Sequence, residues 1–379
     1  MIAVVNYDKL EALPPVMSLL LTLKRLGIRV YFIGMESVAG RAFLQSNAIP
    51  FEFLPPVRRF PQNRIVDYLY RAPSFLPRRR FLKDTLDKLL QEDPDLVVWF
   101  QQVKSAALLG EWCFRYRNRV LTFFELYDRI GINWVGFDFD RFVQTSKIVV
   151  PEYNRAWMLK ECLKLAKLPF VVANKPCEEL IHKDLEPPDS VNKIVVCTKG
   201  RPLFLYQGAV VSDRQDVITV IETIARHRKD YVVAILSNET SETIRLSDEY
   251  TNIFYHPLIP APYHLTLTKS ATVGIAVYKG VGSTLGRLNA AYCAPNKIYE
   301  YAAFGVPTLG NSIPGLKYSV EWSGAGLCCG MDKDSILACA DRLVDEHVSF
   351  SAKALEFYRS CDLSAQVSLV LNHVINFSK

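Results

Sequence analysis

The amino-acid sequence predicts an α/β protein with two doubly wound domains, and three observations lead to this fold class. Short apolar runs rich in Val, Ile and Phe alternate with helical patterns from one end of the chain to the other. This alternation occurs twice, with a proline-containing break between the halves. The 379 residues suit two domains of about 150 residues each. The globular composition, half of it apolar, excludes a disordered or low-complexity chain.

The first half of the chain contains seven expected strands. Each is a short run of apolar, largely β-branched or aromatic residues. Helical patterns separate them, such as residues 15–26, which Gly27 closes, and residues 80–91. The expected strands are residues 2–5, 29–33, 51–54, 95–100, 120–124, 147–150 and 170–173.

The second half repeats the scheme with six expected strands and with helices near 214–227, 295–304 and 334–346. The strands are continuous apolar runs, which are typical of parallel sheets covered by helices on both faces. The expected strands are residues 203–207, 231–236, 252–255, 272–277, 306–309 and 325–328.

The domain boundary is expected within residues 184–200, where prolines and a glycine interrupt the alternation. We therefore predict one domain over residues 1–185 and a second over 186–363. The last helix, 364–379, can pack on either domain. Two doubly wound domains that face each other direct their strand ends into a central cleft, where ligands bind over helix N-termini.

Several classes of protein are excluded. No run of 18 apolar residues is present, so a membrane-spanning helix is not expected. The start, MIAVVNYD, has no secretory signal, and the nine cysteines include no C-x-x-C pair, which favours free thiols in a reducing cytoplasm. A zinc site is not expected, because short Cys/His spacings are missing. The first 181 residues contain no histidine, so a histidine base from that part of the chain is excluded.

The most informative stretch is residues 294–307, APNKIYEYAAFGVP. A proline opens the expected helix, and Lys297 and Glu300 share one face of its first turns. The glycine-rich loop 279–286, which contains Gly282, precedes it. An ammonium group at a helix N-terminus beside such a loop suits a diphosphate. The alternative is a surface ion pair on an ordinary capped helix.

The pattern P-x-K-x-x-E-Y-x-A-x-G-x-P resembles the donor-site motif of glycosyltransferases with the GT-B fold, which has two Rossmann-like domains. The closest resemblance is to family-four-like transferases of bacterial capsule and exopolysaccharide assembly, and it covers most of the chain. Further segments resemble family strands, helices and loops: 203–208 (LFLYQG) with Arg214 after it, 252–276, 94–99 (PDLVVW), 149–159 and 170–180.

The resemblance implies transfer of a sugar from a nucleotide-sugar donor to an acceptor. It implies that Arg214 and Lys297 neutralise the leaving diphosphate, while Glu300 binds ribose or sugar hydroxyls. We place Gly208, Gly282 and Asn296 in the same site, with no cofactor and no metal. In two places the chain departs from the family: Tyr292 stands where members often have Glu, and NYDKLEALPP (6–15) stands where they often have Gly-Gly.

A D-x-D triplet, Asp138-Phe139-Asp140, is the one pattern that suggests a divalent metal. Such triplets elsewhere hold a metal that neutralises a diphosphate. The surrounding sequence, FDFDRF, reads better as the surface start of a helix. We therefore expect no metal here.

An acceptor hydroxyl needs a base in some transferases, and carboxylates are the candidates. Glu125 and Asp128 follow the expected strand 120–124, and Glu152 follows strand 147–150. Asp128 is the first choice, because some related polysaccharide transferases place an aspartate base in this loop. Glu152 with Arg155 can instead form a helix-capping ion pair. A transferase that retains anomeric configuration needs no such base.

The basic charge of the chain is concentrated in residues 58–83. This segment has eight basic residues and one acidic residue, a net charge of +7, whereas the remainder has 37 basic and 38 acidic residues. Five aromatic residues accompany the charge, a combination that suits an anionic membrane surface. No nucleic-acid-binding motif is present, so we do not expect a nucleic-acid partner. The membrane or acceptor candidates are Arg58, Arg59, Arg71, Arg78, Arg79 and Arg80.

The leading hypothesis is a cytoplasmic glycosyltransferase at the inner membrane face. It would extend a saccharide acceptor, in particular a lipid-linked one, in surface polysaccharide biosynthesis. One alternative is a nucleotide-sugar epimerase of the same architecture, which needs no acceptor. Another is a non-catalytic partner subunit of a transferase.

Overall fold

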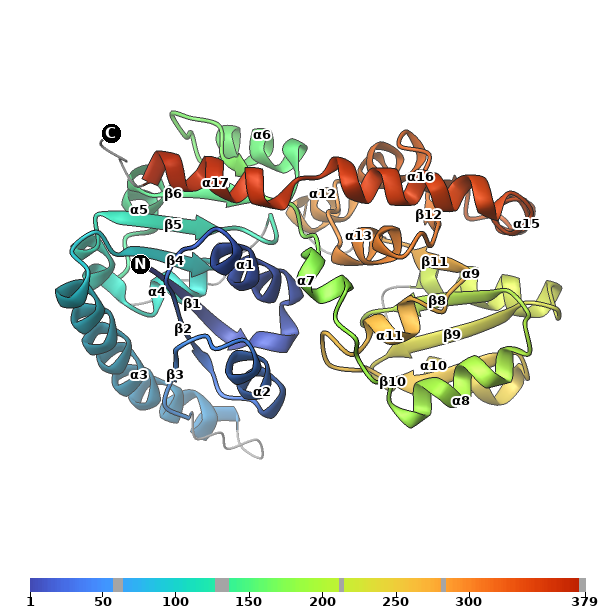
Figure 1. The fold of residues 1–379 in the computed structure, drawn as a ribbon, viewed down its shortest axis with the longest axis horizontal. Helices are drawn as coiled ribbons and strands as arrows, with labels where there is room; N and C mark the ends of the chain where they lie inside the picture. Colours follow the sequence, from blue (N-terminus) through green and yellow to red (C-terminus); the bar gives the residue numbers. More distant parts are fainter. Residues whose placement is uncertain (57–63, 127–135, 211–214, 281–283, 375–379) are drawn as a thin grey trace. The chain divides into compact units, whose positions relative to one another are not determined.

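The computed structural model describes residues 1–56, 64–126, 136–210, 215–280 and 284–374, with only the backbone for 64–75, 215 and 285. The chain forms two compact units. Unit 1 comprises Met1–Ala173 and Leu363–Lys379, and unit 2 comprises Asn174–Asp362. Helices cover both faces of the sheet in each unit (Figure 1).

Unit 1 is built on a parallel sheet of seven strands in the order β3-β2-β1-β4-β5-β6-β7. The strands are β1 (Ile2–Lys9), β2 (Val30–Met35), β3 (Phe51–Phe53), β4 (Val97–Gln101), β5 (Asn118–Thr122), β6 (Lys147–Val150) and β7 (Phe170–Val171). The α-helices are α1 (Pro14–Arg25), α2 (Val38–Ser46), α3 (Arg64–Glu92), α4 (Val103–Ala107), α5 (Phe139–Thr145), α6 (Tyr153–Cys162) and α17 (Leu363–Val374). Two short 3-10 helices, Leu10–Ala12 and Gly110–Arg115, complete the unit.

Unit 2 is built on a parallel sheet of six strands in the order β10-β9-β8-β11-β12-β13. The strands are β8 (Leu203–Gln207), β9 (Val232–Ser237), β10 (Ile253–Pro257), β11 (Val273–Ala276), β12 (Thr308–Asn311) and β13 (Gly326–Cys329). The helices are α7 (Glu178–Ile181), α8 (Asp189–Thr198), α9 (Gln215–His227), α10 (Ser241–Glu249), α11 (Leu265–Thr268), α12 (Thr284–Ala291), α13 (Asn296–Ala303), α14 (Pro314–Leu316), the π-helical turn η3 (Lys317–Glu321), α15 (Lys333–Asp345) and α16 (His347–Ser360).

The predicted fold class is confirmed, and each of the thirteen expected strands coincides with a strand of the structure. Both faces of the unit 2 sheet are buried. Along β8, Phe204 and Tyr206 pack into the core under α9 and α15, whereas Leu203 and Leu205 pack into the core under α8, α11 and α13. This two-sided burial explains why the strands are continuous apolar runs.

The chain enters unit 2 at Asn174, twelve residues before the boundary predicted at 185/186. The difference has a physical cause, because Asn174 and Lys175 are already tied to unit 2. The Asn174 amide donates to the Ala294 carbonyl oxygen (2.9 Å), and the Lys175 ammonium donates to the Tyr358 carbonyl oxygen (2.7 Å). The chain returns to unit 1 at Leu363, and α17 lies along β5, β6 and β7 there (Figure 1).

Helix α3 is longer than expected. It runs over 29 residues, Arg64–Glu92, and so begins well before the helical pattern that we identified at 80–91. Pro73 and Pro77 interrupt the helical pattern in the sequence, and the structure continues the helix through both positions.

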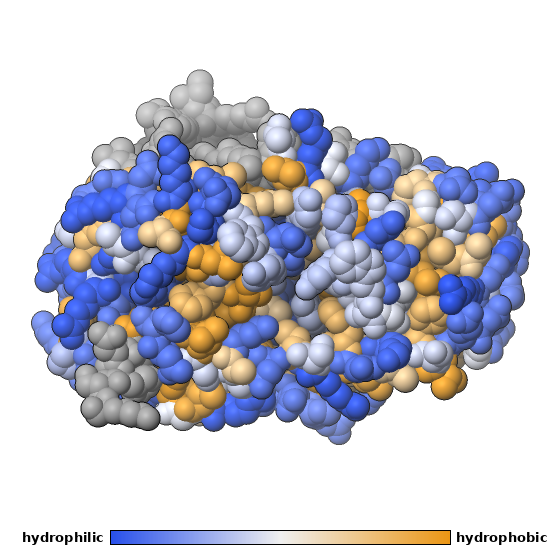
Figure 2. Space-filling model, turned by 90° about the horizontal axis from the view of Figure 1, so that it is seen from above, coloured by the Kyte–Doolittle hydropathy of each residue, from blue (hydrophilic) through white to orange (hydrophobic). Residues whose placement is uncertain are grey.

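No helix in the described ranges combines the length and apolar character needed to cross a bilayer. The face shown in Figure 2 is mainly hydrophilic, with apolar residues in groups between the polar ones.

Candidate nucleotide-binding site

The candidate site of unit 2 begins where β8 ends. β8 lies between β9 and β11, and all five of its residues are buried. The chain then turns at Gly208, whose φ of +139° favours glycine. A Cβ atom at Gly208 would also lie 3.0 Å from Lys297 Nζ. The missing side chain therefore allows the lysine ammonium to approach the end of the strand.

Tyr301 fixes helix α13 on the sheet. It is fully buried, its hydroxyl donates to the Leu205 carbonyl oxygen (2.9 Å), and burial raises its pKa well above the ordinary value. Its ring lies on β11 at Gly274, where a Cβ atom would come within 2.2 Å of Tyr301 Cδ2. This packing sets the position of the first turn of α13 relative to the end of β8.

Lys297 lies in that first turn. Its Nζ is 4.5 Å from the centre of the Tyr206 ring and 5.4 Å from the centre of the Tyr278 ring. Tyr278 follows β11, and Asn311 at the end of β12 binds its backbone N–H and C=O. The macrodipole of α13 places partial positive charge at the helix N-terminus, which disfavours a second positive charge there. An anion bound at this point is therefore stabilised by both the lysine ammonium group and the helix N-terminus.

Glu300, one turn further along α13, belongs to a buried polar network. Its Oε2 accepts a hydrogen bond from Gln207 Nε2 (2.6 Å), and its Oε1 lies 3.2 Å from His264 Nε2. The hydroxyl of Thr268 donates to Gln207 Oε1 (2.9 Å). Glu300 is 5% exposed, and these donors compensate the carboxylate for the hydration that it loses on burial.

The structure brings Gly208, Lys297 and Glu300 together around the end of β8, with Asn296 as the first residue of α13. Arg214 and Gly282 lie outside the described residues. A residue close to each of them in the sequence is described. Lys279, three residues before Gly282, has its Nζ 3.3 Å from the carboxylate of Asp216, two residues after Arg214.

Three members of the network were not predicted, namely Gln207, His264 and Thr268. Gln207 is the last residue of an expected strand, so the rule that ligands bind at strand ends could have identified it. His264 is the N-cap of the short helix α11 and Thr268 is its last residue, and no sequence motif marks this helix.

Two of the predicted carboxylates in unit 1 meet at Arg155. Glu152 caps α6, because its side chain accepts from the backbone N–H groups of Asn154 (2.8 Å) and Arg155 (3.1 Å). The Arg155 guanidinium lies 3.7 Å from Glu125 Oε2 and donates to the Phe124 carbonyl oxygen. Glu152 thus has the capping role that the sequence allowed as an alternative. Asp128 lies outside the described residues.

The basic segment is not uniformly a surface feature. Arg78 is 2% exposed and donates from Nε to the Pro55 carbonyl oxygen (2.6 Å), which corrects its assignment to a membrane surface. Arg79 is half-buried and donates to the Leu108 carbonyl oxygen (2.8 Å), and burial lowers its pKa. Arg80 is exposed and lies 3.7 Å from Asp84. The side chains of Arg58, Arg59 and Arg71 lie outside the described part of the chain.

The D-x-D triplet starts a helix, as expected. Asp138 is the N-cap of α5 and accepts from the backbone N–H of Arg141 (3.0 Å). Among the residues that the structure describes, no three His, Cys, Asp or Glu side chains are grouped so as to hold a metal ion.

Comparisons with known proteins identify the architecture. No family profile matches the chain, and no curated protein matches it. Solved structures do. A glycosyltransferase from Rickettsia africae is 12% identical with a TM-score of 0.66, over 100% of this chain and 99% of the other. Anabaena HepE in complex with UDP-glucose is 11% identical with a TM-score of 0.67, over 98% of both chains.

A Listeria monocytogenes protein described as a UDP-N-acetylglucosamine 2-epimerase is 13% identical with a TM-score of 0.62, over 100% of this chain and 97% of the other. At these identities the likeness shows the fold alone. The chain, with its two α/β units that are each built on a parallel sheet, has the GT-B fold.

Proposed function

We propose that this protein is a glycosyltransferase that moves a sugar from a nucleotide-sugar donor to a saccharide acceptor. The observation that carries the proposal is the position of Lys297. Its ammonium lies at the N-terminus of α13 and beside Gly208, with the Glu300 carboxylate one turn further along the helix. A cation and a helix N-terminus suit a diphosphate, and a carboxylate suits hydroxyl groups.

In the proposed reaction, the bond between the sugar anomeric carbon and the diphosphate oxygen breaks. The bonding electrons leave with the nucleoside diphosphate, and an acceptor oxygen forms the new bond and loses its proton. Lys297, the α13 N-terminus and, in our proposal, Arg214 stabilise the charge on the leaving diphosphate. We assign ribose hydroxyls of the donor to Glu300.

The base that takes the acceptor proton is proposed among Asp128, Glu125 and Glu152. Glu152 is the weakest of these, because its carboxylate is engaged in capping α6. Glu125 has a side chain that is 39% exposed and lies 3.7 Å from Arg155, so an acceptor can reach its carboxylate. A transferase that retains anomeric configuration needs none of the three.

The proposed acceptor is a lipid-linked saccharide at the cytoplasmic face of the membrane. Arg80 is 83% exposed by its side chain, and the exposed Leu76 lies one helical turn before it on α3. Nearby, Lys83 Nζ lies 5.4 Å from the centre of the partly exposed Trp112 ring. Lys83 itself is only 22% exposed and pairs with Asp87, so the exposed cation here is Arg80. An exposed cation near apolar and aromatic groups is typical of interfacial surfaces.

A nucleotide-sugar epimerase is the second candidate function, favoured by the likeness to the Listeria protein. An epimerase converts the donor without an acceptor. Incubation with UDP-N-acetylglucosamine alone, followed by NMR of the sugar, separates the two functions, because only an epimerase yields a new epimer. A non-catalytic partner subunit would neither transfer a sugar nor form an epimer, and it would bind no nucleoside diphosphate.

Ligand binding tests the proposal directly. Thermal unfolding with UDP, GDP, CMP and dTDP should show a rise in Tm with at least one diphosphate, because binding to the native state stabilises it. Lys297→Met should then weaken that diphosphate at least tenfold, since hydrogen bonds to charged groups are worth about 1.5–3 kcal/mol.

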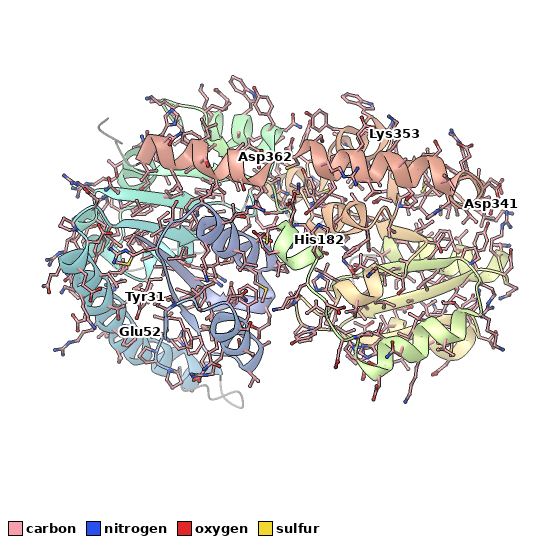
Figure 3. All side chains as sticks on the ribbon, viewed as in Figure 1. Tyr31, Glu52, His182, Asp341, Lys353 and Asp362 are labelled. Carbon is pink, nitrogen blue, oxygen red and sulfur yellow. The ribbon has the colours of Figure 1, made fainter. Side chains whose placement is uncertain are left out.

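The matched control is Lys353→Met, which removes an exposed lysine on α16 (Figure 3) that pairs with Glu356. It should leave diphosphate affinity unchanged. The proposal fails if none of the nucleotides stabilises the protein, or if the two lysine variants behave alike.

A further inference from the structure

Both carboxylate oxygens of Glu300 are in contact with a buried polar side chain. Gln207 Nε2 contacts Oε2 at 2.6 Å, and His264 Nε2 lies 3.2 Å from Oε1. Both partners are themselves buried, Gln207 at 6% and His264 at 9% exposure. Nδ1 of His264 is buried without a hydrogen-bond partner. An arrangement with an unsatisfied buried nitrogen costs stability and calls for a function.

The direction of each hydrogen bond follows from chemistry. An ionised carboxylate only accepts, so the Gln207 amide must turn its NH2 group toward Glu300. Its Oε1 then faces Thr268, whose hydroxyl donates to it at 2.9 Å. In the same way, Nε2 of His264 must carry a proton to interact favourably with Oε1. Hydrogen bonds therefore run in one direction from Thr268 through Gln207 to Oε2 of Glu300, and His264 contacts Oε1.

Each carboxylate oxygen has about two acceptor positions. One donor on each oxygen leaves about one acceptor position on each of the two oxygens. Two vicinal hydroxyl groups, such as the 2′ and 3′ hydroxyls of ribose, match a pair of neighbouring acceptors. Without His264 and Gln207, the carboxylate could rotate and lose this match.

We propose that His264, together with Gln207, is a positioning residue that orients the Glu300 carboxylate for the two hydroxyls of a ribose, so that the site prefers ribonucleotides to 2′-deoxyribonucleotides. This inference rests on the proposed nucleotide-sugar function. A site built to bind a hydroxyl rejects the analogue that lacks it, because its own buried acceptor is left unpaired.

The experiment compares the Kd of UDP with that of 2′-deoxy-UDP by calorimetry. The wild type should prefer UDP about tenfold, the worth of one or two hydrogen bonds. His264→Leu should reduce this preference to about twofold or less by weakening UDP while leaving 2′-deoxy-UDP nearly unchanged. His264→Gln should restore most of the preference, because its amide N–H can reach the place of Nε2–H. If UDP does not bind, GDP and 2′-deoxy-GDP form the test pair.

Two further variants serve as a second test and as a control. His264→Asn is polar but too short to reach Oε1, so it should behave like His264→Leu even if the leucine variant folds poorly. His347→Leu is the matched control, since His347 in the same unit has its Nε2 3.1 Å from the Thr272 carbonyl oxygen and belongs to no part of the network. The control should keep the full preference for UDP.

The outcomes separate the two proposals. Absence of binding to every ribonucleoside diphosphate overturns the proposed function. Equal affinity of the wild type for UDP and 2′-deoxy-UDP overturns the inference about ribose and leaves the proposed function standing. A His264 variant that weakens both nucleotides equally, or lowers Tm while the preference persists, shows a structural role only and also overturns the inference.

Discussion

The ammonium group of Lys175 lies 3.8 Å from the centre of the Tyr358 ring and donates a 2.7 Å hydrogen bond to the Tyr358 carbonyl oxygen. It also donates to the Cys361 carbonyl oxygen, and Tyr358 in turn donates from its hydroxyl to the Pro176 carbonyl oxygen (2.8 Å). Lys175 therefore joins the first residues of unit 2 to the last ones, which end at Asp362 (Figure 3).

Lys175→Met should destabilise unit 2. Lys175 is 6% exposed, and its removal takes away the charged donor to two carbonyl groups at the end of α16. Since each hydrogen bond to a charged group is worth about 1.5–3 kcal/mol, we expect a loss of at least about 2 kcal/mol and a fall of several degrees in Tm. Calorimetry measures this. Lys353→Met, at an exposed pair, should change Tm by less than about one degree. Equal effects of the two variants would contradict the assigned role.

Asp341 should make the stability of unit 2 depend on pH. Asp341, on α15 (Figure 3), accepts from Arg228 and from the Tyr231 hydroxyl, and the Arg228 hydrogen bond lowers the carboxyl pKa below its ordinary value. A lowered pKa in the folded state contributes stability above the unfolded pKa of about 3.9. That contribution is lost as the pH falls through the folded pKa.

Arg228→Gln should therefore reduce stability at pH 7 and have little effect near pH 2. Urea unfolding across this range measures the difference from the wild type. The control Arg359→Gln changes an exposed arginine on α16 and should give a small difference at every pH. A difference for Arg228→Gln that is independent of pH would rule out Asp341 as the group responsible.

The strands were predictable because they are buried on both faces, which makes each a continuous apolar run. The Lys297 and Glu300 pair was predictable because it is local, three residues apart on one helix. The rest of the site is not local. Gln207 and His264 lie 93 and 36 residues from Glu300 in the sequence, and only the position of β8 beside β11 brings them to its carboxylate. Similarly, Arg78 and Arg80 are equivalent in sequence, and only the packing of α3 separates the buried side chain from the exposed one.

The cysteines should differ widely in reactivity. Burial raises the pKa of Cys113, Cys328 and Cys329 to about 12, so at pH 8 only about one thiol in 10⁴ is the reactive thiolate. Cys162 is exposed. Iodoacetamide labelling of the native protein, followed by peptide mass spectrometry, should find Cys162 modified well before these three. Unfolding in urea should remove the difference, and fast labelling of Cys328 in the native protein would contradict the packing around β13.

Arg78 and Arg80 should separate stability from membrane binding. Arg78 is buried, binds the Pro55 carbonyl oxygen and lies 5.5 Å from the centre of the Tyr7 ring, so Arg78→Gln should cost unit 1 about 1.5–3 kcal/mol. Arg80 is exposed and pairs only weakly with Asp84, so Arg80→Gln should change stability by less than about 0.5 kcal/mol. Calorimetry of both variants checks this contrast.

Vesicle flotation gives the second readout. If α3 presents its exposed cations to an anionic bilayer, Arg80→Gln should weaken binding to phosphatidylglycerol vesicles about fivefold, because a basic residue near such a surface is worth about 1 kcal/mol. Arg78→Gln should leave vesicle binding unchanged as long as the protein is folded, since its charge is already covered. Binding should weaken with added salt. Absence of wild-type binding at physiological salt would reject the membrane role while leaving the diphosphate site of unit 2 untouched.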